Sequence, residues 1–566
     1  MGQGISEKID PILLEAFAEA PEQEVLLVLE EKADVSKAKQ LITKEEKGLY
    51  VYRSLLKTAG ESQKEVIAFL EKKNILYRSY FIVNAIYARM GQEEAKVLAS
   101  FPEIKSLLAN PSTSFPEPVR VSDEASLERD GAEWGIKMIG ADEVWAMGYR
   151  GQGVVVGGQD TGYDWAHPAL QSKYRGWDNG SVDHNYNWHD AIHEISPIHG
   201  DSIPSPDLNP CGLDLLEPCD DHSHGTHTMG TMIGSEGEND IGVAPEARWI
   251  GVRNMERGYG SPVTYLEGYQ WFLAPTDLNG ENADPAKAPH VINNSWSCPE
   301  MEGCELSNFH LLEEAVNNLK TAGVVVVVSA GNSGPGCSSI NTPSAIFENS
   351  FSVGATRYND SIANFSSRGP VLVDGSHRMK PNISAPGVGV RSSTLNNEYA
   401  TFSGTSMAGP HVAGVVALMI SANPELAGQV ETIETIIEQT AVPKTDDQEC
   451  GGLSGMEVPN PIYGHGRIDA LAAVQEALLH TNTEEPAAGA LRVFPNPASH
   501  SVQISFPNAD SPVDLLIYDA AGRLVKSMAA VHPSQSIDIQ DLATGLHFIQ
   551  VRTEEQLLLA KVVVHR

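Results

Sequence analysis

The feature that most constrains this chain is its central part, where short runs of β-branched residues alternate with helical stretches rich in glycine and alanine. This alternation is typical of a parallel sheet that is covered by helices on both faces. The expected strands include Gly153–Gly157, Trp249–Val252, Val291–Ile292 and Val324–Val328. We therefore expect an α/β domain over residues 134–480.

The two flanking parts follow different patterns. Residues 24–111 read as strand, helix, two strands, short helix and strand, which is the order of a ferredoxin-like α+β fold. Residues 490–566 alternate polar and apolar residues, with a hairpin turn at Asp519–Gly522, and predict a small β-sandwich. Polar, proline-containing stretches separate these parts. The predicted division is an N-terminal segment 1–23, then domains 24–111, 134–480 and 490–566, with linkers 112–133 and 481–489.

Composition excludes several classes of function. The net charge is −35, so a nucleic acid backbone would be repelled over most of the surface. No apolar run approaches the ~18 residues that a membrane span needs, and none is expected. The first residues show no apolar leader, because Glu7, Lys8 and Asp10 interrupt the stretch.

All six cysteines lie in the central part. An even number, with the close pairs Cys211/Cys219 and Cys298/Cys304, favours disulfides and an oxidising compartment. Six cysteines allow 15 pairings, so the pairing stays open. Buried free thiols are the alternative interpretation.

Two segments place a carboxylate and an imidazole where a parallel sheet exposes side chains. An apolar strand ends at Asp160, and an acidic residue at that edge can hold an imidazole. In Ser223–Thr231, small residues allow a helix to pack tightly while it presents His224 at its first turn. A turn-forming role for Asp160 and a zinc-like pair of His224 with His227 are the alternatives.

Two further segments supply an amide and a hydroxyl. The buried strand Val324–Val328 runs into Ser329-Ala330-Gly331-Asn332, so Asn332 offers an uncharged NH₂ donor for a developing oxyanion. Ser406 begins a helix that is apolar on every face and must be buried, with its polar first turn aimed at a specific partner. An ordinary Asn turn and a simple helix cap are the alternatives.

Together, these four segments resemble the subtilisin-like serine peptidases, or subtilases (peptidase family S8). The strings Phe365–Pro370 and Asn382–Gly387 resemble the family's loops before the nucleophile, and Asp183–His193 resembles the bacillopeptidase F-type branch. The resemblance implies a secreted serine endopeptidase. Ser406 would be the nucleophile, His224 the general base, Asp160 its orienting carboxylate and Asn332 the oxyanion donor.

The resemblance also implies where a protein or peptide substrate lies. Substrate would extend along the edge segment 291–297 as an added strand. The residues implied to contact it are Asn294, Ser295, Trp296, Ser297, Ser329, Ala330 and Gly331. Many relatives have glycine where this chain has Ser297 and Cys298, which leaves the shape of the specificity pockets open.

The flanking domains resemble known companions of such peptidases. Residues 24–111 resemble the inhibitor-type prodomain, which implies a chaperone and intramolecular inhibitor released by cleavage between Ser112 and Arg129. The tail, which opens with Val493-Phe494-Pro495-Asn496-Pro497, resembles the sorting domain of type IX secretion substrates. This implies a self-processed zymogen that is secreted or held at the cell surface. A carbohydrate-binding or adhesion module is the alternative for the tail.

Two other classes of protein remain as hypotheses. A metal-dependent hydrolase is suggested by His189 and His193, four residues apart, with His184 and His199 nearby, although Asp190 stands where a glutamate is expected. A catalytically inactive binding protein with the same fold is the other. The resemblance implies no cofactor for catalysis and allows structural calcium. No ligands are named, because acidic loop residues are too numerous, among them Asp207, Asp214, Asp220 and Asp221.

Overall fold

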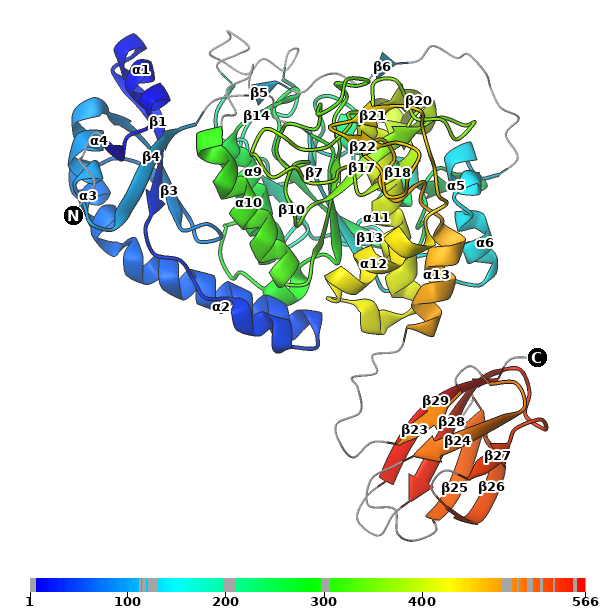
Figure 1. Cartoon of the computed structure of the whole chain (residues 1–566). Coiled ribbons are helices and arrows are strands. Elements are labelled where there is room, and N and C mark those ends of the chain that lie inside the picture. The colour runs from blue at the N-terminus through cyan, green and yellow to red at the C-terminus, as the bar shows by residue number, and fades with distance from the viewer. Residues whose placement is uncertain are drawn as a thin grey trace. The chain divides into compact units, whose positions relative to one another are not determined.

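The computed structural model describes residues 7–110, 113–114, 119–120, 131–196, 209–296, 306–480, 491–495, 498–505, 513–519, 523–532, 535–552 and 557–564. The chain divides into two compact units, Met1–His480 and Thr481–Arg566. The first unit contains an N-terminal block (residues 7–110) and an α/β block (residues 131–480), which Figure 1 shows in blue and in cyan to orange.

The N-terminal block has a four-stranded antiparallel sheet in the order β2-β3-β1-β4. Its elements are α1 Pro11–Glu19, β1 Glu22–Leu29, η2 Ser36–Gln40, α2 Lys44–Ser62, α3 Lys64–Lys73, β2 Tyr77–Tyr80, β3 Ala85–Gly91, α4 Gln92–Ala99 and β4 Ile104–Ala109. This is the order of elements that the sequence predicts. Helix α1 is an addition that the prediction missed.

The two faces of this sheet are covered differently, because successive residues of a strand point to opposite sides. Leu27 packs in a core with residues of the block's own helices α1, α3 and α4. Leu26 and Val28 belong to a core shared with helices α9 (Pro262–Leu273) and α10 (Leu306–Thr321) of the α/β block. The second face is therefore buried by the α/β block.

The α/β block is built on a seven-stranded sheet in the order β10-β13-β7-β15-β16-β17-β18, in which every pairing is parallel. This confirms the predicted fold class. The strands are β7 Val155–Asp160, β10 Trp188–Asp190, β13 Arg248–Arg253, β15 Val291–Asn294, β16 Val325–Ser329, β17 Phe351–Thr356 and β18 Ile383–Pro386.

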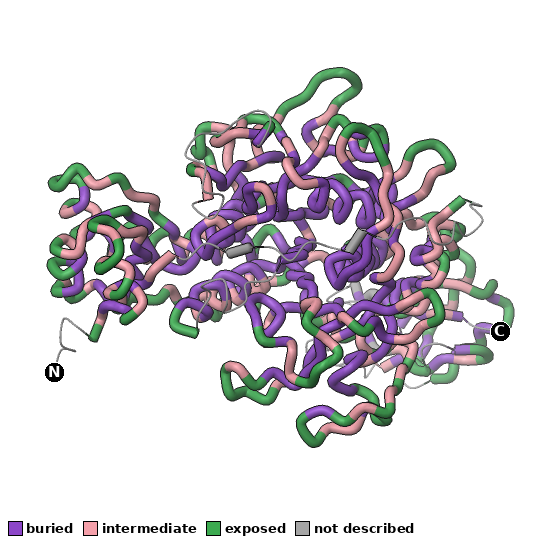
Figure 2. Tube along the Cα trace, turned by 90° about the horizontal axis from the view of Figure 1, so that it is seen from above, coloured by how far each residue is buried: buried purple, intermediate pink, exposed green. Residues whose placement is uncertain are grey.

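Helices cover both faces of this sheet, as predicted. One core contains residues of α8 (His224–Ile233), α11 (Thr405–Ala422), α12 (Val430–Thr440) and α13 (Ala470–Leu479), and the other contains residues of α9 and α10. In Figure 2 the buried backbone forms the interior and the exposed residues lie mainly in outer loops. The carboxyl ends of the strands are thus free to carry functional side chains.

Helix α11 runs through the middle of the α/β block. By length and composition alone its 18 residues would suffice to cross a membrane, a length that the sequence prediction said no apolar run approached. Within the fold, 89% of this stretch is buried. Burial on all sides explains its composition, as expected for the central helix of a covered sheet.

Two disulfides join cysteines of the α/β block that the structure describes. Cys211–Cys219 confirms one of the close pairs favoured by the sequence, and Cys337–Cys450 joins residues that are 113 positions apart. No cysteine among the described residues is free. The predicted pair Cys298/Cys304 lies outside the described residues.

The second unit is a β-sandwich of a three-stranded sheet, β23-β24-β27, and a four-stranded sheet, β26-β25-β28-β29. Its strands are β23 Arg492–Phe494, β24 Ser501–Ser505, β25 Val513–Asp519, β26 Leu524–Val531, β27 Ser536–Asp538, β28 Gly545–Arg552 and β29 Leu557–Val564. Side chains from both sheets, such as Val502 and Ile549, share one core. This confirms the predicted sandwich, although residues 520–522 of the predicted turn lie outside the described residues.

Candidate active site

The fold brings the side chains of Asp160 and His224 together. Asp160 ends strand β7 and His224 begins helix α8. His224 Nδ1 donates a hydrogen bond of 2.7 Å to Asp160 Oδ1, and the two residues are 0% and 1% exposed. The Thr161 backbone N–H donates to the same oxygen at 2.8 Å. Because the carboxylate holds Nδ1–H, Nε2 is the ring atom that can accept a proton.

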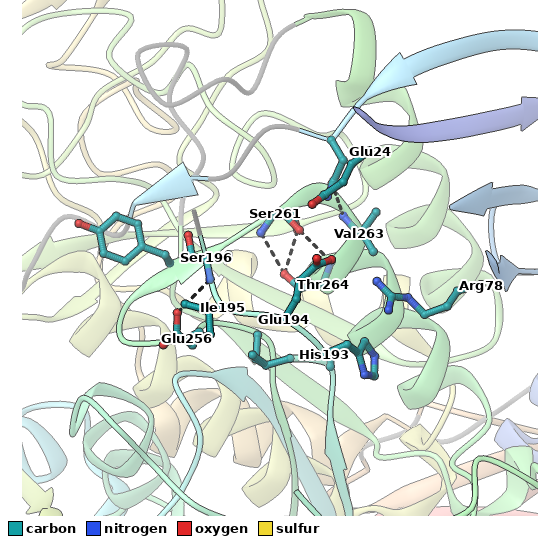
Figure 3. A pocket seen from close by; sticks show the side chains of 15 residues that line it. Glu24, Arg78, His193, Glu194, Ile195, Ser196, Glu256, Ser261, Val263 and Thr264 are labelled. Atoms are coloured by element: carbon teal, nitrogen blue, oxygen red, sulfur yellow. Dashed lines mark hydrogen bonds between the residues drawn. The ribbon is translucent and has the colours of Figure 1, made fainter. Parts of the chain in front are cut away.

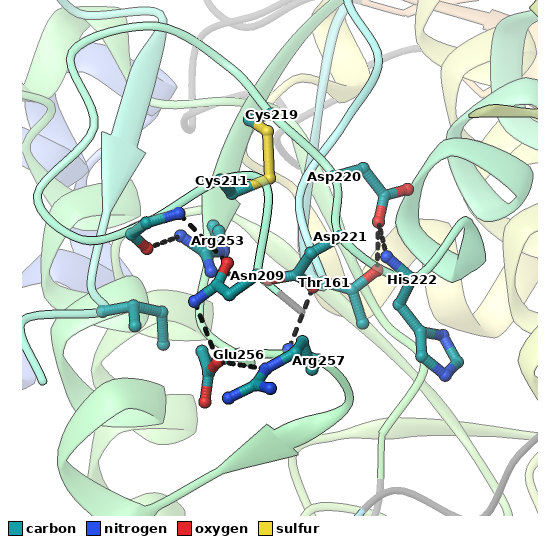
Figure 4. Close-up of polar contacts among 12 residues, drawn as sticks. Thr161, Asn209, Cys211, Cys219, Asp220, Asp221, His222, Arg253, Glu256 and Arg257 are labelled. Atoms are coloured by element: carbon teal, nitrogen blue, oxygen red, sulfur yellow. Dashed lines mark hydrogen bonds and ion pairs between the residues drawn. A yellow bond between two sulfur atoms is a disulfide. The ribbon is translucent and has the colours of Figure 1, made fainter. Parts of the chain in front are cut away.

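Asp220, which the prediction did not single out as catalytic, joins the turn after β7 to the start of α8 (Figure 4). Its Oδ1 accepts hydrogen bonds from Thr161 Oγ1 at 2.9 Å and from the Ser223 N–H at 3.0 Å. Its Oδ2 accepts from the Thr226 N–H at 3.0 Å and from Thr226 Oγ1 at 2.6 Å. These bonds fix Ser223 in a left-handed conformation with φ of 75°, a strained backbone of the kind found at functional sites.

The nucleophile candidate Ser406 is the second residue of α11 and is 2% exposed. Its Oγ donates to the Ser295 carbonyl oxygen at 3.2 Å, and Ser295 Oγ donates to the Ser406 carbonyl oxygen at 3.0 Å. The first N–H groups of a helix have no acceptor within the helix. The Ser406 N–H therefore lies where an anion can be bound.

Asn332 lies beside the start of α11. Its Oδ1 accepts hydrogen bonds from the Thr405 N–H and from Thr405 Oγ1, both at 2.9 Å. Its Nδ2 is 3.6 Å from the position that a Cβ on Gly404 would occupy. Because Thr405 holds the amide oxygen, the NH₂ group is fixed as a donor near Gly404, two residues before Ser406. The side chain is half-buried and can be reached from solvent.

The prediction that residues 291–297 form an edge is wrong for the first four. Strand β15 lies inside the sheet, paired with β7 on one side and β16 on the other, so its backbone is already hydrogen-bonded. Asn294 is 1% exposed, and its side chain is enclosed in the fold. A substrate strand could pair only with the segment that follows, where Ser295 and Trp296 lie.

The Trp296 side chain is turned away from any substrate. It is 2% exposed and stacks on the Tyr265 ring of α9, with ring centroids 3.8 Å apart and an interplanar angle of 4°. Only the Trp296 backbone is therefore placed to meet a peptide. Ser297 lies outside the described residues.

The segment Ser329-Ala330-Gly331 continues from β16 toward Asn332. Ser329 and Ala330 are buried, and the Ala330 N–H donates to the Val353 carbonyl oxygen at 3.0 Å. Gly331, with φ of 102°, is the partly exposed member. A Cβ there would come within 2.9 Å of Ser367 Oγ, so the approach of the two segments requires glycine.

Two short pieces of the predicted linker 112–133 lie on the α/β block. Strand β5 (Thr113–Ser114) pairs antiparallel with β14 (Tyr259–Gly260). Strand β6 (Val119–Arg120) pairs antiparallel with Phe402–Ser403 of β20 (Glu398–Ser403). The second contact ends three residues before Ser406.

A cavity lies between the two blocks, near β14 (Figure 3). Glu24 and Arg78 line it from the N-terminal block, and His193 and Glu194 line it from the α/β block. Burial and the nearby Glu194 carboxylate raise the pKa of Glu24. None of the candidate catalytic residues lines this cavity, so it is not the candidate active site.

The histidines behind the metal-hydrolase hypothesis do not share a helix face. His189 lies in β10 and His193 in the loop after it, and the Nε2 atoms of both donate to Glu267 Oε1, at 2.9 and 2.7 Å. Despite its burial, hydrogen bonds to Glu267 and Asp214 raise the pKa of His193 to about 9. Among the described residues, no group of three or more His, Cys, Asp and Glu side chains is arranged to hold a metal ion.

The acidic residues considered for calcium have other partners or are not described. Asp214 Oδ1 is 2.5 Å from His193 Nδ1, and Asp221 forms an ion pair of 2.5 Å with the buried Arg253 (Figure 4). Burial raises the pKa of Asp221 to about 7, even though Arg253 opposes the shift. Asp207 lies outside the described residues.

The hydrogen bonds of His227 show its structural role. Its Nε2 donates to the carbonyl oxygens of Val390 and Ala400, at 3.1 and 3.2 Å. Burial and the neighbouring His224 lower its pKa to about 3, so the ring is neutral. His227 therefore ties α8 to the two strands that precede α11, and the alternative of a zinc-like pair with His224 finds no support.

Comparison with known proteins agrees with this architecture. Residues 214–466 match the model of the subtilase family, and residues 492–565 match that of a secretion system C-terminal sorting domain. Bacillopeptidase F from Bacillus subtilis is 36% identical over 83% of this chain and 32% of its own length. Serine protease AprX from the same organism is 33% identical, over 44% of this chain and 59% of its own length. The chain thus spans about a third of the length of bacillopeptidase F and about three fifths of the length of AprX.

Shorter relatives are covered almost completely. Subtilisin Savinase from Lederbergia lenta is 34% identical over 48% of this chain and 86% of its own length. A crystal structure of an epidermin leader peptide processing serine protease from Staphylococcus aureus has a TM-score of 0.57, at 16% identity, and covers 81% of this chain and 99% of that one. The latter likeness shows the fold alone. The chain belongs to the subtilase family of serine peptidases.

Proposed function

We propose that this chain is a secreted serine endopeptidase that hydrolyses peptide bonds with Asp160, His224 and Ser406. The observation that carries this proposal is the buried hydrogen bond of 2.7 Å between His224 Nδ1 and Asp160 Oδ1. An imidazole held in this way is the general base that a serine hydroxyl needs to become a nucleophile. Membership of the subtilase family supports the same assignment, and subtilases need no cofactor for catalysis.

The proposed reaction has two halves. Ser406 Oγ attacks the scissile carbonyl carbon while His224 Nε2 takes the hydroxyl proton. Collapse of the tetrahedral intermediate breaks the C–N bond, and the leaving amine receives that proton. Water, deprotonated by the same imidazole, then attacks the acyl-enzyme and releases the carboxylic acid and Ser406. Asp160 stays ionised throughout and stabilises the imidazolium.

The developing oxyanion would be held by two donors, Asn332 Nδ2 and the Ser406 backbone N–H. The two bonds from Thr405 support this role, because they fix the amide oxygen and leave the NH₂ group as a preorganised donor. Preorganised donors stabilise the transition state without having to reorient during the reaction.

The substrate would lie extended across the nucleophile. Its acyl side would pair with β14 and with the backbone of Ser295 and Trp296, and its leaving side would pair with β20. The linker pieces β5 and β6 support this path, because they pair with β14 and β20 on either side of the residues 115–118. Protein and peptide chains can adopt such an extended form, which is the basis of strand addition.

Residues 24–111 are proposed to be a prodomain that acts as chaperone and intramolecular inhibitor. The face of its sheet that holds Leu26 and Val28 is covered by α9 and α10, and exposing so large an apolar face would be unfavourable. Gln270 Oε1 also accepts hydrogen bonds from the N–H groups of Phe81 and Ile82, at 2.7 and 3.2 Å. Release would follow cleavage within the linker 112–133.

The C-terminal unit is proposed to direct secretion through the type IX machinery, which would leave the enzyme outside the cell or on its surface. The match of residues 492–565 to a secretion system sorting domain favours this over an adhesion module. Disulfides in the α/β block fit an oxidising destination.

The test compares the purified chain with a Ser406→Ala variant by intact mass spectrometry. We expect the parent to be cut within the linker, to hydrolyse a casein substrate and to react with a fluorophosphonate, and the variant to do none of these. A chelator such as EDTA should not abolish fluorophosphonate labelling directly.

Equal processing of both chains would contradict self-maturation. Absence of labelling and hydrolysis in a parent chain already freed of its prodomain would contradict the peptidase assignment and favour an inactive binding protein. Hydrolysis that the chelator abolishes and the fluorophosphonate does not would favour a metal-dependent hydrolase.

A further inference from the structure

Helix α2 reaches from the N-terminal block to the α/β block with its first turns (Figure 1). A Cβ on Gly48 would lie 3.6 Å from Pro285 Cβ, in the short helix η4 (Pro285–Lys287). A Cβ on Gly428 would lie 2.9 Å from Lys44 Cα. Because Gly428 has φ of +82° as well, any other residue there would both strain the loop and displace α2.

Hydrogen bonds of three side chains complete this contact. They run from Lys44 Nζ to the Ala288 carbonyl oxygen at 2.8 Å, from Lys47 Nζ to the Gly428 carbonyl oxygen at 2.7 Å, and from Gln429 Nε2 to the Ile42 carbonyl oxygen at 2.7 Å. Lys44 and Lys47 are only 4% and 8% exposed. Lysine is seldom buried to this extent, so the contact is a specific one.

This contact lies at the amino ends of the strands, the end of the sheet opposite the candidate active site. Ala288 precedes the start of β15 at Val291, and Gly428 packs against Gly323, just before the start of β16 at Val325. Both strands are parallel to β7, whose last residue is Asp160. The amino ends of the strands therefore meet α2, whereas their carboxyl ends carry the candidate catalytic residues.

We propose that residues 41–48, here called the anchor segment, hold the prodomain on the catalytic domain independently of the active site and keep it bound after the linker is cut. This inference rests on the proposed role of residues 24–111 as an inhibitor. The prodomain then has three attachments: the linker at the carboxyl ends of the strands, the sheet face that packs on α9 and α10, and the anchor segment at the amino ends. While any one of them holds, the others rebind as intramolecular events at high effective concentration.

The anchor segment thus lengthens the time for which the inhibitor stays bound after processing. Cleavage of the linker removes the covalent connection at the carboxyl ends of the strands. It leaves the hydrogen bonds of Lys44 and Lys47 intact. Full release requires both ammonium groups to leave their carbonyl partners. Because each of these hydrogen bonds is made by a charged ammonium group, losing one should speed release about tenfold or more.

The experiment uses full-length chains with Ser406→Ala, so that no self-cleavage occurs, and with a recognition sequence for an added site-specific protease in place of residues 121–126. After the linker is cut by that protease, size-exclusion chromatography measures how fast the N-terminal fragment leaves. The variants are Lys47→Glu and the milder Lys47→Met. The matched control is Lys57→Glu, an exposed lysine on the same helix.

We expect the fragment of the parent and of the Lys57→Glu chain to stay bound after the cut, and that of either Lys47 variant to leave about tenfold faster or more. If Lys47→Glu does not fold, Lys47→Met decides. Equal release from all chains, or immediate release from the parent, would overturn the anchor. Because the chains are catalytically inactive, this result does not depend on whether the peptidase proposal holds.

Discussion

Ser295 and Ser406 exchange hydrogen bonds: each hydroxyl donates to the other residue's carbonyl oxygen, at 3.0 and 3.2 Å. In a regular helix the Ser406 carbonyl would accept from the N–H four residues later. That residue is Pro410, which has no N–H. Ser295 Oγ therefore replaces the missing helical donor, and the backbone of the candidate nucleophile is fixed by a residue on another segment.

The first prediction concerns this replacement. In a Ser406→Ala chain, Ser295→Ala should lower the unfolding free energy by about 1–3 kcal/mol, because a buried carbonyl loses its partner. Pro410→Ala restores a helical N–H, so Ser295→Ala should be milder in that background. Thermal unfolding of the four combinations measures the difference. Strictly additive effects would show that Ser295 does not replace the helical bond.

The Asn332→Asp variant tests the role of the NH₂ donor separately from that of the amide oxygen. Aspartate keeps an oxygen for the two bonds from Thr405 but replaces the NH₂ donor with a negatively charged atom. We expect kcat on a peptide substrate to fall about 10²–10³-fold or more, with KM nearly unchanged, as for loss of an oxyanion donor in related peptidases. A rise in KM with unchanged kcat would assign Asn332 to ground-state binding instead.

Asp220 is predicted to position the Asp160–His224 pair. In Asp220→Asn, an NH₂ group replaces one of the two oxygens that accept from Thr161, Ser223 and Thr226, so the start of α8 should shift. A misplacement of this kind lowers kcat by up to about a hundredfold while KM changes little.

Asp221→Asn is the matched control for this variant. It weakens the buried ion pair with Arg253 and leaves the hydrogen bonds at the start of α8 in place. We therefore expect it to lower the thermal midpoint while kcat stays nearly unchanged. If both variants reduce kcat only in proportion to their loss of stability, Asp220 is structural and not a positioning residue.

The sequence predicted much of this site because its segments carry local signals. Asp160 follows an apolar strand, and Ser406 opens a helix that is apolar all around, so both could be placed without coordinates. Asp220 and Ser295 act through contacts that no local pattern records. Asp220 reaches Thr161 across 59 residues, and Ser295 reaches Ser406 across 111. The closest local signal for Asp220 was an acidic residue shortly before a helix start, where carboxylates are common.

The placement of the predicted substrate edge depended on the sheet order. The run at Val291 was correctly predicted as a strand, but whether a strand is internal or at an edge depends on its neighbours. Strand β15 is internal because β7 and β16 flank it. Its pairing with β7 could not be read from a local pattern, since about 130 residues separate Asp160, the last residue of β7, from the start of β15. Likewise, α2 was predicted as a helix, but its contact with Gly428 could not be read from the sequence.

The pKa of Lys44 gives the anchor segment a dependence on pH. Burial lowers this pKa to about 8 when α2 is docked, opposed by Glu45 on the same helix and assisted by Arg175. Burial lowers the pKa of the half-buried His290, and the charge on Lys44 lowers it further. Undocked, Lys44 returns to about 10.4. The docked form therefore binds fewer protons between these values, and a rise in pH across this window favours docking.

We accordingly expect the cut, inactive chain to release its N-terminal fragment more slowly as the pH rises from 8 to about 10.4. Lys44→Met should remove this part of the pH dependence, since no proton is then gained on release. The comparison with Lys44→Met also subtracts other groups at the contact between the blocks, such as His193. An unchanged pH profile in the variant would show that Lys44 does not titrate on docking.

The last prediction locates the maturation cut. Thr113–Ser114 pairs with β14, and Val119–Arg120 pairs with Phe402–Ser403, which lies three residues before the candidate nucleophile Ser406. A chain cleaved where it lies must have its scissile bond between these two contacts. Mass spectrometry of the matured parent should therefore find a new N-terminus at one of residues 115–119. A terminus after Arg120 would mean that the linker moves before it is cut, and that the pairing with β20 is not the productive one.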